Sequence, residues 1–497
     1  MRPGRYRPIV RLGSWLRGGI VTVELDVSVD LTPGWRLAFT SVAPLTPHDP
    51  SATELVEQLG TYHVVAPASP TSVCPGGRWT AQLTPGHELR HANDGPRSAY
   101  VITAAGDVID ADVEPTVSPE RTAEAAPSAL AVVPSGDQFD PPTFAWRGLH
   151  VDLARQWFEP DTVEWLIDVA AERGLNRLHL HLTDDEGWRL PVEDYPALAH
   201  AAVRGHGLVL PPMLGGGAQP EGRLYTAGEI ARWVAHAGAA GVVLVPEVDM
   251  PAHMHAALAA LPELRDPDDR TGARSIQGFL DNVLVPGHPE TDPFVDAVLD
   301  ALCALFPASP WIHIGGDEVA PGAWARSPIA ARFAAARGAA GANAIAAAFM
   351  RDIADRVRQR GRQVVAWQEI AEAGGLDPDD GNVLCWQSVG VARVLAAKGF
   401  DVVVAPGSAY YFDMAADDRW ESPGSSWAGS VSVERVADFE PGRGWSEQAL
   451  AHLVGVQACL WTEHVRDRAS IERMLLPRLD AFARRAWTGR RPALVDL

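Results

Sequence analysis

Trp311-Ile-His-Ile-Gly-Gly-Asp-Glu-Val319 predicts a buried strand that ends in two acidic side chains. Its apolar first half is typical of a parallel strand, and the two glycines then free the backbone. Asp317 and Glu318 therefore stand side by side at the carboxyl end of the strand, which in an α/β barrel is the catalytic face. One carboxyl can donate a proton there while the other stays ionised. The alternative is a solvated acidic turn or a helix start.

The sequence on both sides alternates short apolar strands with helical stretches. The helices include residues 161–173 and 343–359, and Thr226-Ala-Gly-Glu229 fits a capping box before another. Eight strands are expected, at 145–152, 177–182, 241–247, 311–314, 363–367, 383–386, 401–405 and 455–460. Eight βα units within residues 141–497 predict an α/β fold, with a closed (β/α)8 TIM barrel as catalytic domain. An open doubly wound sheet is the alternative, but no glycine-rich phosphate loop follows any strand.

Residues 1–105 have a different pattern, with short alternating strands such as 21–29, 35–39 and 78–83 between Gly and Pro turns. This pattern predicts a smaller N-terminal β-sandwich-like domain before the barrel. Residues 106–140 are rich in Ala, Pro, Ser, Glu and Asp. We expect them to form a connecting segment or a reduced α/β domain.

The composition excludes several classes of partner. The 497 residues carry a net charge of −21, which disfavours nucleic acids and anionic membrane surfaces. The N-terminus lacks the apolar core of a signal peptide and no run of 18 apolar residues occurs, so a cytoplasmic protein without a membrane span is expected, although export without a recognisable signal stays open. Four scattered cysteines indicate no disulfide framework. The chain has one lysine, Lys398.

Charged and aromatic side chains gather at the expected strand ends, as a neutral sugar requires. Carboxylates and arginine bind hydroxyls, and indole rings cover C–H faces. The set comprises Arg147, Asp152, Arg155, Asp184, Asp185, Glu247, Asp249, His253, Asp317, Glu318, Trp367, Trp386, Tyr411, Asp413, Trp461 and Glu463. Core packing is the alternative for each tryptophan. A structural ion-pair network is the alternative for the three residues of the first strand, and we favour it for Asp152 and Arg155 but not for Arg147.

Histidines near the same strand ends raise the question of a metal. His179 and His181 alternate along one strand, and a Met-Pro pair interrupts the helix that His253 and His255 would need. We therefore expect no metal and no cofactor. Histidines that orient carboxylates by hydrogen bonds are the better interpretation.

These motifs together resemble the family 20 glycoside hydrolases, the β-N-acetylhexosaminidases, over about residues 141–490. The shared patterns are Arg-Gly-x-x-x-Asp-x-x-Arg at 147–155, His-x-Thr-Asp-Asp-x-Gly-Trp-Arg at 181–189, Pro-Glu-x-Asp-x-Pro-Gly-His at 246–253 with Ala252 for the glycine, Gly-Gly-Asp-Glu at 315–318, Trp-x-Glu at 367–369, Tyr-x-Asp at 411–413 and Gln-x-x-x-Trp-x-Glu at 457–463. The N-terminal region resembles, more weakly, a β-sandwich of some bacterial members.

The resemblance implies an exo-acting β-N-acetylhexosaminidase that removes terminal N-acetyl-D-hexosamine, GlcNAc or GalNAc, from a small-molecule or oligosaccharide substrate. The mechanism would be substrate-assisted and retaining, through an oxazolinium intermediate. Asp317 would hold the acetamido group, and Glu318, its pKa raised by Asp317 and by burial, would be the general acid and base. The alternative is a catalytically silent carbohydrate-binding protein, although binding alone does not need Glu318.

The resemblance also implies roles for the other side chains. Indoles would wall the acetamido pocket, Tyr411 would bond the acetamido carbonyl, three residues would bind the outer hydroxyls, and two would support the acidic pair. The substrate-binding residues are in this order Trp367, Trp386, Trp461, Tyr411, Arg147, Asp413, Glu463, Asp184 and His253. Gln156, Glu186 and Gln368 depart from the common pattern and bear on linkage or leaving-group preference. The natural substrate and the oligomeric state stay open.

Overall fold

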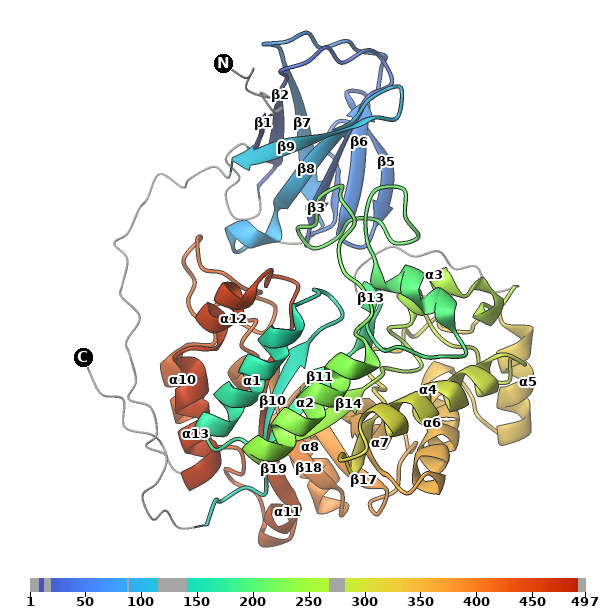
Figure 1. Ribbon diagram of the computed structural model, residues 1–497, viewed down its shortest axis with the longest axis vertical. Coiled ribbons are helices and arrows are strands. Elements are labelled where there is room, and N and C mark those ends of the chain that lie inside the picture. The colour runs from blue at the N-terminus through green and yellow to red at the C-terminus, as the bar shows by residue number, and fades with distance from the viewer. Residues whose placement is uncertain (1–8, 13–18, 87–88, 115–140, 268–281, 490–497) are drawn as a thin grey trace.

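The computed structural model describes residues 9–12, 19–86, 89–114, 141–267 and 282–489 of the chain. Two parts are visible in Figure 1. An all-β domain, drawn in blue, lies above a larger barrel, drawn from green to red. Among the described residues, no helix has both the length and the apolar character needed to cross a membrane.

The larger part is a closed barrel of eight parallel strands, which confirms the predicted (β/α)8 TIM barrel and excludes an open sheet. The first strand pairs with both the second and the last, so no edge is left. Each strand lies within two residues of its predicted range. The strands are β10 (Trp146–Asp152), β11 (Arg177–His181), β14 (Val243–Glu247), β15 (Trp311–His313), β16 (Gln363–Trp367), β17 (Gly381–Cys385), β18 (Asp401–Val404) and β19 (Leu453–Leu460).

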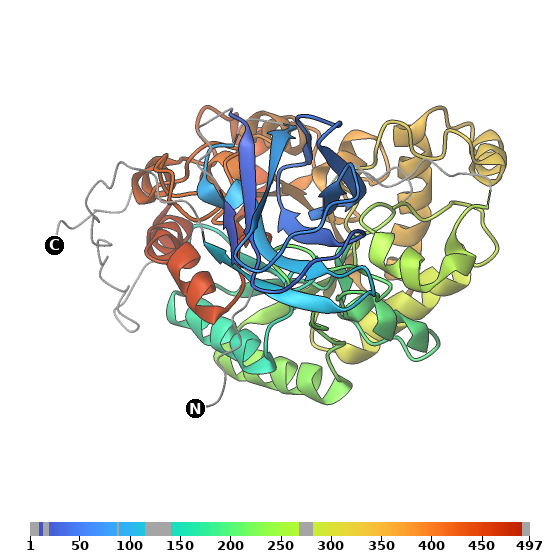
Figure 2. The ribbon, with the colours of Figure 1, turned by 90° about the horizontal axis from the view of Figure 1, so that it is seen from above.

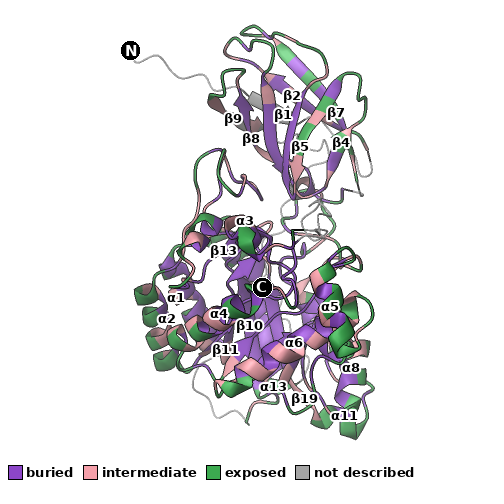
Figure 3. Cartoon of the chain, turned by 90° about the vertical axis from the view of Figure 1, so that its right-hand side faces the viewer, coloured by how far each residue is buried: buried purple, intermediate pink, exposed green. Residues whose placement is uncertain are grey.

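Helices surround the barrel and bury one face against it. Figure 3 shows buried strands in the centre and helices with green outer faces. The helices are α1 (Pro160–Glu172), α2 (Ala227–Ala240), α3 (His255–Ala260), α4 (Thr291–Leu305), α5 (Pro328–Arg337), α6 (Ala342–Gln359), α7 (Gln368–Glu372), α8 (Val389–Ala397), α9 (Gly407–Tyr410), α10 (Val433–Asp438), α11 (Glu447–Ala451), α12 (Arg468–Leu475) and α13 (Arg478–Thr488).

Local sequence signals explain where several helices begin and end. The predicted capping box is present: Thr226 Oγ1 accepts the Glu229 N–H at 3.2 Å, and Glu229 Oε2 accepts the Thr226 N–H at 2.8 Å. Helix α2 then ends at Gly241 in the left-handed conformation. Helix α8 ends at the exposed Lys398, three residues before β18 begins. Lys398 therefore lies at the amino end of the barrel strands.

The described residues of the smaller part form nine strands in one continuous sheet, in the order β4-β7-β2-β1-β9-β8-β3-β6-β5. The strands are β1 (Ile9–Leu12), β2 (Val21–Asp26), β3 (Arg36–Ser41), β4 (Leu45–Pro47), β5 (Thr53–Leu59), β6 (Tyr62–Pro67), β7 (Arg78–Pro85), β8 (Pro96–Ile102) and β9 (Val108–Glu114). Alternate side chains of β2 and β7 share a core with β3 and β8, so the sheet packs on itself like a sandwich.

The expected boundary at residue 105 needs a correction. Strand β9 covers Val108–Glu114 and pairs with β1 and β8, so the β domain includes residues that we expected in the connecting segment 106–140. The alternating Val108-Ile-Asp-Ala-Asp-Val113 carries a strand pattern that the acidic composition hides. The rest of that segment, residues 115–140, lies outside the described residues, and so does the expected reduced α/β domain.

The β domain lies against the carboxyl ends of the barrel strands. Seen from above, it covers the middle of the barrel (Figure 2). The loop at 213–218 contributes Met213, Leu214 and Ala218 to an apolar cluster with β3, β6 and β8. Backbone N–H groups of the same loop donate to Thr61 and Thr40 of the β domain, each at 2.9 Å. The two parts thus share a core and hydrogen bonds at the end of the barrel where active sites form.

Candidate active site

A cavity of about 640 Å³ opens at the carboxyl ends of the barrel strands. It brings together nine of the predicted site residues. They are Asp184, His253, Asp317, Glu318, Trp386, Tyr411, Asp413, Trp461 and Glu463. A second cavity of about 620 Å³ shares Glu318 and Trp386 with the first, so these two side chains stand between the cavities.

The turn after β15 places the two acids. Gly315 and Gly316 have φ angles of +72° and +108°, which favour glycine. A Cβ on Gly315 would lie 1.7 Å from Asp249 Oδ1, and one on Gly316 would lie 2.2 Å from Ile370. Glu318 itself has a φ of +50°, a sparsely populated conformation for a side-chain-bearing residue. The turn therefore fixes both acids against their neighbours.

Asp317 faces a second buried carboxyl, that of Asp249. Asp249 Oδ2 and Asp317 Oδ1 are both buried without a donor among the described residues, which is the arrangement of two carboxyls that share a proton. Burial, followed by the neighbouring Asp317, raises the pKa of Asp249 well above its usual range. Burial also raises the pKa of Asp317. The charge of His253 and the hydrogen bond to Asp249 lower this pKa, but by less than burial raises it. The hydrogen bond between the two carboxyls raises the pKa of Asp249 and lowers that of Asp317, so it favours the shared proton on Asp249.

His253 joins the acidic pair to the barrel. Its Nε2 lies 3.5 Å from Glu318 Oε2 and 3.9 Å from Asp317 Oδ2, and its Nδ1 lies 3.1 Å from Asp184 Oδ1. Burial opposes a charged ring, but Asp184 more than offsets it and the pKa of His253 rises well above its usual value. His253 is therefore bonded to Asp184 through Nδ1, and its Nε2 faces the two acids.

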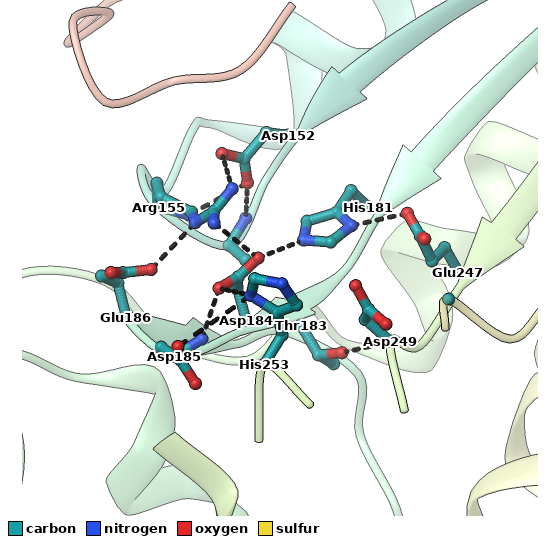
Figure 4. Close-up of polar contacts among 12 residues, drawn as sticks. Asp152, Arg155, His181, Thr183, Asp184, Asp185, Glu186, Glu247, Asp249 and His253 are labelled. Atoms are coloured by element: carbon teal, nitrogen blue, oxygen red, sulfur yellow. Dashed lines mark hydrogen bonds and ion pairs between the residues drawn. The ribbon is translucent and has the colours of Figure 1, made fainter. Parts of the chain in front are cut away.

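Arg155 is the centre of an ion-pair network behind His253 (Figure 4). Its guanidinium lies 2.8 Å from Asp184, 2.8 Å from Glu186, 3.3 Å from Asp152 and 3.7 Å from Glu463. Burial raises the pKa of Asp184, but Arg155 and His253 more than offset this and hold it well below its usual range. Arg155 also lines the cavity, so the network is part of the site itself.

A chain of buried groups continues from Asp184 into the barrel (Figure 4). His181 lies between two carboxylates, with Nε2 2.7 Å from Asp184 and Nδ1 2.5 Å from Glu247. Burial alone would lower the pKa of His181, but Glu247 and Asp184 more than offset burial and raise this pKa to about 10. Glu247 also lies 2.7 Å from His313 Nδ1 and accepts from the Trp367 indole at 2.9 Å. This chain fixes the position of Asp184 relative to the barrel.

Aromatic rings form one wall of the cavity. Trp386 stacks on Tyr411 with ring centres 6.4 Å apart, and Tyr411 lies 6.2 Å from Trp461. Trp427 stands perpendicular to both Trp386 and Tyr411, 5.9 Å from each. Flat apolar faces beside carboxylates are suited to a sugar ring, whose C–H groups pack on indole while its hydroxyls bond to the acids.

Asp413 and Glu463 are two further acids that line the cavity. Burial, followed by the charge of Glu463, raises the pKa of Asp413 well above its usual range, and burial likewise raises the pKa of Glu463. Carboxyls of this kind can both accept from and donate to sugar hydroxyls. On the Trp386 side, burial and then Asp317 raise the pKa of Glu369 to about 8, and Glu369 accepts from the Trp386 indole at 2.9 Å.

The structure corrects the predicted place of Arg147. This residue lies at the amino end of β10, where its guanidinium donates to the carbonyls of Gly174 at 2.8 Å and Phe144 at 2.7 Å and packs over the Trp487 ring. Five residues of strand, roughly 16 Å, separate it from the carboxyl end. Arg155, which we expected in a purely structural role, is the barrel arginine that lines the cavity.

Trp367 also differs from its expected place. Its ring is completely buried and packs 4.9 Å from His313 and 6.1 Å from Trp461, and it does not line the cavity. Trp367 therefore supports the aromatic wall and Glu247 from within the barrel. Core packing, the alternative that the sequence left open for each tryptophan, applies to this one.

Several cavity residues escaped the sequence analysis. Trp427 lies in a Gly- and Ser-rich loop without strand or helix periodicity, so only its aromatic character could have drawn attention to it. The β domain contributes Val42, Pro44, Arg90 and Asp94. No local pattern in the sequence relates these four residues to barrel strands that lie hundreds of residues away.

Among the described residues, four groups of three His, Asp and Glu side chains are close enough together to hold a metal ion. Two sets touch the cavity, Asp184 with Asp185 and His253, and Asp249 with His253 and Asp317. Asp184 already contacts Arg155, His181 and His253, and Asp249 already accepts the Gly316 N–H. Ion pairs and hydrogen bonds within the protein account for the placement of these side chains.

The geometry can be compared with known proteins. The sequence profile of the glycosyl hydrolase family 20 catalytic domain matches residues 144–490. The chain belongs to glycosyl hydrolase family 20. The match includes the barrel, the turn with the two acids and the aromatic wall. The resemblance that the motifs indicated is thereby confirmed.

Relatives and solved structures of family 20 agree with this assignment. A β-hexosaminidase of Vibrio furnissii is 38% identical over 69% of this chain, which spans 57% of that relative's length. A β-N-acetylhexosaminidase of Cellulomonas fimi is 32% identical over 80% of this chain and 76% of its own. The crystal structure of a family 20 exo-β-N-acetylglucosaminidase from Vibrio harveyi, in complex with N-acetylglucosamine, has a TM-score of 0.86 and 25% identity, and covers 98% of this chain and 95% of its own.

Proposed function

We propose that the protein is an exo-acting β-N-acetylhexosaminidase that hydrolyses terminal GlcNAc or GalNAc residues. The observation that carries the proposal is the placement of Asp317 and Glu318 together in a cavity walled by Trp386, Tyr411 and Trp461. The proposed mechanism needs no carboxylate of the protein as nucleophile, because family 20 enzymes use the substrate's own acetamido group for that role.

Asp317 would act on the acetamido group. Its ionised oxygen can accept the amide N–H, which turns the carbonyl oxygen toward the anomeric carbon. Attack by that oxygen forms the C–O bond of a cyclic oxazolinium as the glycosidic bond breaks. The developing positive charge is stabilised by Asp317, and Asp249 keeps the shared proton away from it. Tyr411 would donate its hydroxyl proton to the carbonyl oxygen.

Glu318 would transfer the protons. It protonates the leaving glycosidic oxygen in the first step and deprotonates the attacking water in the second, so the configuration at the anomeric carbon is retained. His253 at 3.5 Å holds the Glu318 side chain in place and is itself held by Asp184. Arg155, Asp413 and Glu463 would bind the outer hydroxyls of the terminal sugar.

The proposal is tested by release of nitrophenol from the β-N-acetylglucosaminide by the wild type, Glu318→Gln and Asp317→Asn. We expect activity on the N-acetyl substrate and a loss of about 10²- to 10⁴-fold in kcat in either variant, since each removes one catalytic group. The plain β-glucoside, which lacks the acetamido nucleophile, should not be hydrolysed by any of the three.

Two outcomes would contradict the proposal. Hydrolysis of the plain glucoside at a similar rate would require a nucleophile from the protein. A folded wild type without activity on either substrate, but with affinity for N-acetylglucosamine by calorimetry, would favour the silent carbohydrate-binding protein.

A further inference from the structure

The β domain contributes one side of the cavity that the barrel otherwise forms. Val42 and Pro44 follow β3, Arg90 and Asp94 precede β8, and all four line the cavity together with barrel residues. Figure 2 shows the domain above the middle of the barrel, over the carboxyl ends of the strands. An accessory domain that only bound to the outer surface of the barrel would not reach this position.

The exposure of the lining residues shows which end of the cavity is the mouth. Asp413 is 3% exposed, whereas Trp427 is 58% exposed and Arg90 is exposed as well. The groups that can bind outer hydroxyls are thus deep, and Trp427 and Arg90 are at the opening. A substrate whose terminal sugar enters first must leave its remaining sugars at this opening, beside the β domain.

Hydrogen bonds fix the β domain to one loop of the barrel part. Arg90 donates from Nη1 to the Ser426 carbonyl at 3.2 Å, His91 donates from Nδ1 to the Arg419 carbonyl at 2.9 Å, and the Ala92 N–H donates to the Trp420 carbonyl at 2.8 Å. The Trp420 side chain packs against the core of the β domain. We call residues 419–427 the strap, and Trp427 is its last residue.

The strap connects the β domain to the aromatic wall. Trp427 contacts Trp386 and Tyr411, which line the deeper part of the cavity. A further contact joins β8 to the segment after β19, where the buried Arg97 donates to the Glu463 carbonyl at 3.0 Å. The β domain is therefore held by polar contacts to two segments of the barrel part, the strap and the residues after β19.

We propose that the β domain forms the leaving-group subsite of this enzyme, with Arg90 and Trp427 as the residues that contact the second sugar. The inference rests on the proposed function. The Arg90 guanidinium offers donors to a hydroxyl or acetamido oxygen of that sugar, and the Trp427 ring covers its C–H face.

The test compares two substrates with the same terminal sugar, the β-1,4-linked disaccharide of N-acetylglucosamine and the nitrophenyl β-N-acetylglucosaminide. Arg90→Ala should lower kcat/KM for the disaccharide about tenfold more than for the aryl substrate, as expected for the loss of one charge-assisted hydrogen bond. Most of the change should be in KM. Arg78→Ala is the matched control, since Arg78 lies on β7 of the same domain and does not line the cavity.

A second set of variants tests the strap. Trp420→Ala should lower the ratio of kcat/KM for the disaccharide to kcat/KM for the aryl substrate, and Trp420→Phe should restore this ratio. Trp420→Ala combined with Trp427→Ala should lower the ratio no further than Trp427→Ala alone, because Trp420 acts as a positioning residue for Trp427. Thermal unfolding of each variant separates loss of the site from loss of the fold.

The second cavity is the alternative place for the leaving group, and variants of its lining distinguish the two. If the leaving group lay there, Gln387→Ala would change the ratio of the two substrates, because Gln387 lines only that cavity, and Arg90→Ala would change both substrates equally. That result would overturn the inference and leave the proposed function intact. A wild type without activity on either substrate would instead show that the proposed function fails.

Discussion

Two arginines of one segment, Arg147 and Arg155, show how much depends on single positions along a strand. Both belong to the motif Arg-Gly-x-x-x-Asp-x-x-Arg, and they lie at opposite ends of β10. Arg147 binds backbone carbonyls at the amino end, whereas Arg155 contacts four carboxylates at the cavity. The motif identified the family, but its letters do not say which arginine lines the cavity.

The pair predicts different effects of the same substitution. Arg155→Lys keeps the charge but loses the planar fork that contacts Asp184 and Glu186, so we expect kcat/KM to fall by about tenfold or more. Arg147→Lys should lower the melting temperature and leave kcat/KM within about twofold of wild type. Steady-state kinetics and calorimetry on both variants check this. A larger kinetic effect for Arg147→Lys would restore the role that the sequence suggested.

His253 predicts a pH-dependent contribution to stability. Its pKa in the folded protein is raised well above the value of about 6.5 in the unfolded chain, so its contribution is fully present below that unfolded value and is lost as the pH rises through the folded one. We expect the free energy of unfolding of wild type to exceed that of His253→Asn by about 1–3 kcal/mol at pH 5.5, and by less at alkaline pH.

Urea unfolding at pH 5.5, 7 and 9 measures this difference. The control is His452→Asn, whose half-exposed ring pairs with Asp401 at 2.9 Å and whose loss should change the free energy of unfolding by about 0.5 kcal/mol or less. A gap between wild type and His253→Asn that widened toward alkaline pH would contradict the raised pKa.

At the scale of the element, the turn after β15 couples fold and chemistry. Gly316 has a positive φ and no room for a Cβ, because Ile370 of α7 lies against it. Gly338, which ends α5, has a positive φ of +65° and open space around it. An alanine at Gly338 would therefore introduce backbone strain alone, whereas an alanine at Gly316 would introduce the same strain and a steric clash with Ile370.

Gly338→Ala should reduce the free energy of unfolding by about 1 kcal/mol and leave kcat unaffected, because it adds only backbone strain far from the cavity. Gly316→Ala should cost more stability and lower kcat by about tenfold or more, since it displaces Asp317 and Glu318. Calorimetry and nitrophenol release on both variants give the comparison. Equal effects on kcat would show that the turn does not set the position of the acids.

Elements were the most predictable level of this structure. Apolar runs bounded by glycine and polar residues located all eight barrel strands, and Thr226-Ala-Gly-Glu229 located the start of α2, because these signals depend on neighbours in the sequence. Strand β9 was missed since its polar face resembles a linker. Trp427, Arg155 and Arg90 could be assigned only from the structure, because their roles depend on contacts between distant segments.

At the scale of the whole molecule, the shared core between the β domain and the barrel predicts that they unfold together. Met213 is 1% exposed and packs among residues of the β domain, although it belongs to a barrel loop. Met213→Ala should cost about 2–5 kcal/mol and lower a single calorimetric transition. Leu208→Ala, at a residue 41% exposed and five positions earlier in the chain, should change stability by about 0.5 kcal/mol or less.

Two separate transitions in the wild type, with only one of them shifted by Met213→Ala, would contradict this coupling. The β domain would then be an independent unit that rests on the barrel, and its contribution to the cavity would depend on how often the two parts meet.

Lys398 has a practical consequence for handling the protein. Reagents that attack primary amines find a single lysine side chain, at the end of α8 and exposed. It lies at the amino ends of the barrel strands, whereas the cavity opens at their carboxyl ends. Coupling through this side chain to a resin or a sensor chip would hold the molecules in a common orientation, with the cavity turned away from the support and open to dissolved saccharides.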